Sequence, residues 1–166
     1  MTNKNNLLNL NERRLERRII GCIREGIKEN CINQITIAEE DITELGKLNN
    51  KNPYFYFGQA FNLLSNYYIS LRKALDTGDE TSLFPIHALE HVNKGLKLSV
   101  GNRDGIVTKT GILYCLATSN VNEHVDNFFN YLDYALSIHS KDIDLLFFKA
   151  SAHYRITKNY KKKILV

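Results

Sequence analysis

The sequence is poor in cysteine and has no long apolar run. Its three cysteines, Cys22, Cys31 and Cys115, are an odd number without paired spacing, which argues for a reducing compartment and against a disulfide framework. No apolar run reaches the length of about 18 residues that a membrane helix needs. Residues 1–10 lack the apolar segment of a signal peptide. We therefore expect a cytoplasmic protein with no membrane partner, in which the cysteines are ordinary apolar side chains.

Glycine-rich phosphate loops are also missing, and the signals for catalysis are weak. Neither G-x-x-x-x-G-K-[ST] nor G-x-G-x-x-G occurs. The segment His87-Ala88-Leu89-Glu90-His91 matches the H-x-x-E-H of inverted zinc peptidases, in which two histidines hold zinc and the glutamate activates water. No third ligand is evident, and such short pairs arise readily by chance, so a solvated helix face is the favoured interpretation. We predict no enzyme activity, no metal site and no cofactor.

Helical periodicity dominates the sequence. No segment shows the sustained period-two alternation and tight turn of a β-hairpin. Apolar stripes at three-and-four spacing predict about seven helices, near residues 10–30, 37–48, 53–76, 82–101, 104–116, 121–136 and 142–156, with 159–166 as a short helix or frayed end. Short connections make successive helices antiparallel neighbours. We expect an all-α fold, with a flexible N-terminus over 1–10 and a single domain of antiparallel helix hairpins over 11–166.

Local signals mark several helix ends. Thr36 and Glu39 form a possible capping box, Pro53 suits a first helical position, and Gly101 suits the left-handed residue after a helix. The remaining N-terminal caps are expected at residues with short polar side chains: Asn11, Ser82, Asp104 and Asp142.

One apolar pattern recurs in three of the predicted helices. It consists of an apolar residue, a second four residues later, a small residue three further on and then a large one: Ile19, Ile23, Gly26, Ile27; Ala88, Val92, Gly95, Leu96; Phe128, Leu132, Ala135, Leu136. The small residue should let a neighbouring helix approach closely. We expect Leu96 and Leu132 to be buried at helix interfaces.

This spacing resembles the second helix of a tetratricopeptide repeat, a helix-hairpin repeat. A stretch near the C-terminus resembles its first helix, through Phe147, Ala150, Ser151, Tyr154 and Tyr160. The interval from Gly95 to Ala135 exceeds the family's repeat of about 34 residues, Ser140 stands where proline is usual, and Lys163 replaces a small residue. The fold is therefore either a tetratricopeptide-like array or an irregular helical bundle, and the resemblance implies protein binding.

Tyrosine is the best clue to a binding surface. Neighbouring rings on a helix point about 100° apart, so one face cannot bury them all. We predict partner-binding residues at Tyr54, Tyr56, Tyr67, Tyr68, Tyr131 and Tyr134. The first four should form an exposed patch on a long helix that overhangs its neighbours, and would suit a client or a homodimer. The alternative is that stacked hairpins bury two faces and enclose these rings.

A basic face on the first helix gives a second hypothesis. Its members are Arg13, Arg14, Arg17, Arg18 and Arg24, in a chain of net charge +4. These arginines either follow nucleic-acid phosphates or are solvated and paired with the acidic segment 39–44. We favour a non-enzymatic helical-repeat adaptor, chaperone or regulator that binds a protein or peptide. The alternative is a nucleic-acid-associated regulator.

Overall fold

The chain is all-helical in a computed structural model that describes residues 2–28, 37–77, 86–118 and 123–164. These residues form seven α-helices and no strand: α1 (Thr2–Lys28), α2 (Glu39–Leu48), α3 (Pro53–Thr77), α4 (Ile86–Leu98), α5 (Arg103–Thr118), α6 (Glu123–Ile138) and α7 (Ile143–Ile164). Within the described ranges, none of the helices combines the length and apolar character required to cross a bilayer. The predicted all-α fold class is confirmed.

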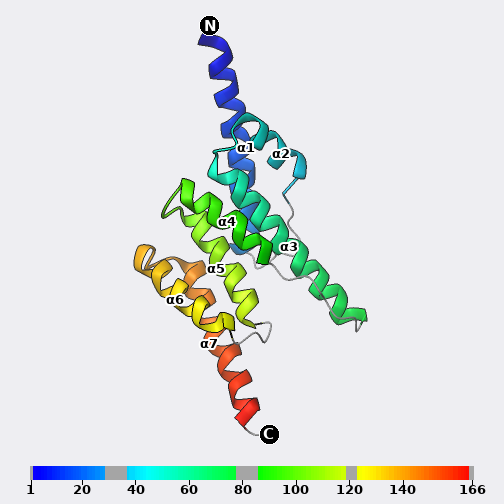
Figure 1. Ribbon diagram of the computed structural model, residues 1–166, viewed down its shortest axis with the longest axis vertical. Coiled ribbons are helices and arrows are strands. Elements are labelled where there is room, and N and C mark those ends of the chain that lie inside the picture. Colours follow the sequence, from blue (N-terminus) through cyan, green and yellow to red (C-terminus); the bar gives the residue numbers. More distant parts are fainter. Residues whose placement is uncertain (1, 29–36, 78–85, 119–122, 165–166) are drawn as a thin grey trace.

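Successive helices pack against each other along the chain. The main contacts join α1 to α2, α3 to α4, α4 to α5, α5 to α6 and α6 to α7, and α5 also contacts α1, α3 and α7. Figure 1 shows the N-terminal part of α1 and the C-terminal part of α7 projecting from opposite ends, while the end of α3 extends sideways. All seven helices contribute side chains to the apolar core.

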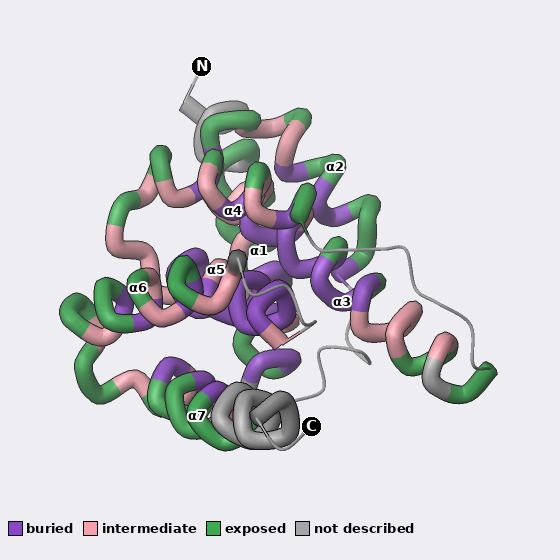
Figure 2. Tube along the Cα trace, turned by 60° about the horizontal axis from the view of Figure 1, so that its bottom comes forward, coloured by how far each residue is buried: buried purple, intermediate pink, exposed green. Residues whose placement is uncertain are grey.

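Helix α5 is the most buried helix of the described structure. Thirteen of its sixteen residues are buried, and Figure 2 shows it near the centre of the molecule. A helix that is apolar all round is suited to such an interior position. Its two buried threonines donate hydrogen bonds to carbonyls one turn earlier, Thr108 to Asp104 at 2.7 Å and Thr110 to Ile106 at 2.9 Å. The hydroxyl groups are thereby satisfied inside the core.

Small residues allow aromatic rings to enter the helix interfaces. The Phe57 ring lies so close to Gly95 and Gly105 that an added Cβ would be 2.4 and 2.5 Å from it. The Phe61 ring lies equally close to Gly26, at 2.6 Å from an added Cβ. The predicted role of the small residues in close approach is confirmed at Gly26 and Gly95.

The apolar members of the recurring pattern lie in the core, with two exceptions. Leu132 is buried as expected, whereas Leu96 is only half-buried, so that prediction is correct in part. Leu136, at the matching position of α6, is also half-buried. In the C-terminal stretch, Phe148 is buried while its neighbour Phe147 is exposed. The side chain of Tyr160 lies outside the described residues.

Several predicted helix ends are confirmed. Pro53 is the first residue of α3, and Gly101 has a φ of 77° after α4. Asp142 caps α7, because its Oδ1 accepts hydrogen bonds from the backbone N–H groups of Asp144 at 3.0 Å and Leu145 at 3.2 Å. The expected capping box is wrong, because α2 begins at Glu39 with Ala38 as its N-cap and has no side-chain cap hydrogen bond. Thr36 itself, Ser82 and Cys31 lie outside the described residues.

Other ends differ from expectation. Helix α1 begins at Thr2, so residues 2–10 are helical and Asn11 is not the cap. Asp104 is not the cap of α5, since Asn102 Oδ1 accepts the backbone N–H of Gly105 at 3.2 Å. Helix α7 continues to Ile164 without a break before residue 159. No proline or glycine interrupts residues 2–10 or 143–164, and nothing local therefore stops either helix.

Replacing Leu132 by alanine is expected to destabilise the fold by about 2–5 kcal/mol, because a 1% exposed side chain leaves a cavity when truncated. Urea unfolding of the purified variants measures this loss. Leu98→Ala is the matched control, since Leu98 is 47% exposed and its truncation should cost about 0.5 kcal/mol or less. Equal stability of the two variants would contradict the packing of α6.

Candidate functional site

A groove lies over α5, between α4 and α6. Helix α5 packs against both flanking helices, and the groove has a volume of about 380 Å³. This is within the range of small ligand sites, about 300–1,000 Å³. Its lining combines apolar, aromatic and basic side chains: Asn93, Leu96, Lys97, Val100, Gly101, Ile106, Lys109, Tyr131 and Tyr134.

Lys109 places a cation inside this groove. Its Nζ lies 4.4 Å from the centroid of the Tyr131 ring, at a distance suited to a cation–π contact. Burial lowers the pKa of Lys109 below its ordinary value. In the described part of the chain, no carboxylate forms an ion pair with it. The charge of the ammonium group is therefore not neutralised by any carboxylate in the described ranges.

Two of the predicted binding residues, Tyr131 and Tyr134, also line this groove. Tyr131 and Tyr134 stand one turn apart on α6, with ring centroids 5.7 Å apart. Tyr134 is 46% exposed, whereas the Tyr131 hydroxyl is buried and has no hydrogen-bond partner among the described residues. Burial also raises the pKa of Tyr131, which keeps the hydroxyl protonated as a donor. The lining of the groove thus combines the exposed ring of Tyr134, the ammonium group of Lys109 and the Tyr131 ring, whose buried hydroxyl is unused.

The four tyrosines of α3 do not form the exposed patch that we expected. Tyr67 is 6% exposed, and Tyr54, Tyr56 and Tyr68 are half-buried. Tyr68 accepts a 2.9 Å hydrogen bond from the Cys115 thiol. Helix α3 contacts α1, α2, α4 and α5, and this stacking encloses several of its faces, as in the alternative interpretation.

The thiols that the structure describes have no sign of activation. Burial raises the pKa of Cys115 to about 12, and burial is also the largest cause of the raised pKa of Cys22. Both thiols are therefore protonated and poorly nucleophilic at neutral pH.

The basic face of α1 divides into two groups. Arg18 forms a 3.0 Å ion pair with Asp41 of α2, and Arg24 binds Asp104 of α5. Arg13, Arg14 and Arg17 are exposed and make no ion pair with the residues described. Pairing with the acidic segment is thus confirmed for Arg18 alone.

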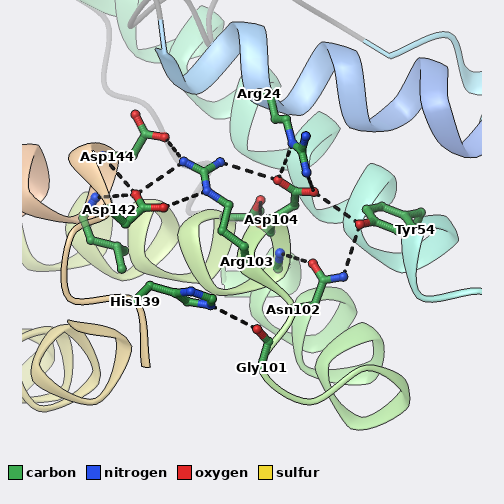
Figure 3. A network of polar contacts seen from close by, with 12 residues as sticks. Arg24, Tyr54, Gly101, Asn102, Arg103, Asp104, His139, Asp142 and Asp144 are labelled. Carbon is green, nitrogen blue, oxygen red and sulfur yellow. Dashed lines mark hydrogen bonds and ion pairs between the residues drawn. The ribbon is translucent and has the colours of Figure 1, made fainter. Parts of the chain in front are cut away.

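A polar network around Asp104 joins the first helix to the last (Figure 3). The Asp104 side chain is 1% exposed, and its two oxygens accept hydrogen bonds from Arg24 at 2.9 and 3.0 Å. The Tyr54 hydroxyl donates to the same carboxylate at 3.2 Å. Arg103 reaches Asp104 at 3.5 Å, and on its other side it binds Asp142 at 2.7 Å and also Asp144.

The sequence patterns do not predict this network. They indicate only a helix cap at Asp104 and no role for Arg103. The available signal was a pair of opposite charges, Arg103 and Asp104, at the start of an otherwise largely apolar segment, since buried charges require partners.

A second hollow, of about 270 Å³, lies between α2, α3 and α4 and is lined in part by Gln59 and His91. The Gln59 Oε1 and His91 Nδ1 atoms are buried there without partners in the described ranges. His87 is exposed. Among the residues described, no group of three or more His, Cys, Asp or Glu side chains could hold a metal ion. The H-x-x-E-H segment therefore gains no third ligand from this part of the chain.

Replacing Arg24 by alanine is expected to lower the free energy of unfolding by about 1–3 kcal/mol, because the buried Asp104 carboxylate loses two charged hydrogen bonds. Arg17→Ala is the control, since Arg17 is exposed on the same helix and its removal should change stability by about 0.5 kcal/mol or less. Chemical denaturation of both variants gives the comparison. If both unfold at the same denaturant concentration, the ion pair does not stabilise the junction of α1 and α5.

No protein-family model matches this chain, and no match was found for it among curated proteins or solved structures.

Proposed function

We propose that this protein is a non-enzymatic helical-repeat adaptor, chaperone or regulator that holds a peptide or a partner's helix in the groove between α4, α5 and α6. The proposal rests on one observation: two tyrosines and a lysine, Tyr131, Tyr134 and Lys109, line the same groove. Tyrosine supplies a large contact area at low entropic cost and is favoured at binding surfaces. A location in the cytoplasm is part of the same proposal, on the basis of the unpaired cysteine spacing.

The order of helix contacts supports a tetratricopeptide-like arrangement. Each of α4 and α6 packs on α5, while α5 also contacts α3 and α7. In stacked helix hairpins, each helix contacts its own partner and the helices of the next hairpin. A homodimer stays a prediction, but the exposed α3 patch on which it was based is absent from the described structure.

Replacing Tyr134 by alanine is expected to weaken client binding about tenfold or more, since truncating a tyrosine hot spot costs over 1 kcal/mol. Affinity capture from the source cells first identifies clients of the wild-type protein. Their dissociation constants are then measured for wild type and variant.

Tyr154→Ala is the matched control, because Tyr154 is an exposed tyrosine on α7 outside the groove. It should retain the clients. Clients held equally well by wild type and by Tyr134→Ala would place binding elsewhere and refute the proposal.

A nucleic-acid-associated regulator is the second candidate. The specific observation in its favour is that Arg13, Arg14 and Arg17 are exposed on α1 without an ion pair in the described part of the chain. Arginines that remain unpaired are free to contact phosphates, and such contacts make affinity depend on salt.

If these arginines contact nucleic acid, the double change Arg13→Ala, Arg17→Ala should lower the salt dependence of binding to a DNA duplex. The slope of log K against log[salt] should fall by about 2 in magnitude, about one for each lost phosphate contact. Fluorescence anisotropy between 50 and 200 mM salt gives the slope. Arg18→Ala is the control, because Arg18 is paired with Asp41. Absence of binding at the lowest salt concentration would eliminate this candidate.

A further inference from the structure

Two hydrogen-bond donors in the groove between α4, α5 and α6 have no acceptor among the described residues. The Tyr131 hydroxyl is buried without a partner. Lys109 Nζ stands 4.4 Å from the centre of the same ring and forms no ion pair in that part of the chain. An unused buried donor costs free energy, and that cost is recovered when a ligand supplies the acceptor.

The charge of the groove is of one sign. Its lining includes Lys97 and Lys109 but no aspartate or glutamate, and Asn93 is its one amide side chain. A cationic ligand would therefore meet like charges without a compensating carboxylate. An anionic group would meet an ammonium group that is already partly removed from water, where attraction between opposite charges is stronger than in bulk solvent.

The rest of the lining is suited to a peptide. Leu96, Val100 and Ile106 provide apolar surface, and Tyr134 adds an exposed ring. Bidentate recognition of phosphate favours arginine, whose planar fork binds two oxygens, and no arginine lines this groove. A carboxylate needs fewer donors than a phosphate and can accept from an N–H and an O–H together.

We propose that the groove selects a peptide through one carboxylate, which accepts hydrogen bonds from the Lys109 ammonium and the Tyr131 hydroxyl. The carboxylate is that of an aspartate or glutamate side chain, which a peptide or a partner's helix can present along its length. This assignment rests on the proposed peptide-binding function, and it names the chemistry that the same site recognises.

Two display libraries of random twelve-residue peptides test the assignment with the full-length protein. One presents its peptides with a free C-terminus, and the other presents them internally. Enrichment of aspartate or glutamate at one position in both libraries is the expected result. Enrichment confined to the first library would identify a terminal carboxylate instead and overturn the assignment to a side chain.

The strongest peptide is then synthesised with its carboxylate and with the matching amide. The amide is expected to bind the wild-type protein about tenfold or more weakly, because charge-assisted hydrogen bonds are lost. For Lys109→Gln, the preference for the carboxylate over the amide should fall well below the wild-type value, because the charged donor is lost and the Tyr131 hydroxyl remains. Lys141→Gln, at an exposed lysine outside the groove, should keep the wild-type preference.

The possible failures are distinct. Peptides that lose affinity on Tyr134→Ala but show no preference for the carboxylate would overturn the carboxylate assignment and leave peptide binding in place. The absence of enriched peptides, or binding unaffected by Tyr134→Ala, would overturn both. The comparison of carboxylate and amide on the wild-type protein is decisive even if Lys109→Gln fails to fold.

Discussion

The enclosure of α5 is the constraint on which the rest of the structure depends. Five helices contact it, so each charged group that is fully buried on it requires a partner inside the protein. The carboxylate of Asp104 is the most demanding of these groups, because an unpaired buried charge is strongly unfavourable. Arg24 of α1 and Tyr54 of α3 supply its hydrogen bonds. The positions of three helices are thereby coupled at one carboxylate.

Close packing around α5 depends on small residues as much as on large ones. Phe57 fits between Gly95 of α4 and Gly105 of α5, and a methyl group at either glycine would overlap its ring. The ring therefore fills the space where α3, α4 and α5 meet. Because α4 and α6 both pack on α5, a groove is left above α5 between them.

The burial of each tyrosine depends on how many helices pack around the helix that carries it. Helix α3 contacts four other helices, whereas α6 packs mainly on α5 and α7. The tyrosines of α3 are consequently half-buried or buried, and one of them, Tyr54, completes the polar network. Tyr134 of α6 remains exposed beside the groove, while the neighbouring Tyr131 keeps a buried hydroxyl without a partner in the described part of the chain.

The sequence by itself determined the helices, because their signals are local. Apolar spacing located all seven, Pro53 and Asp142 marked two starts, and the recurring small residues indicated close approach at Gly26 and Gly95. Tertiary structure decided which tyrosines reach the surface, since two residues of the same type differ only in what packs around them. It also decided the role of Asp104, whose partner Arg24 lies 80 residues away in the sequence. Such a pair leaves no periodic signal in the sequence, and a groove shared by three helices exists only after those helices have packed.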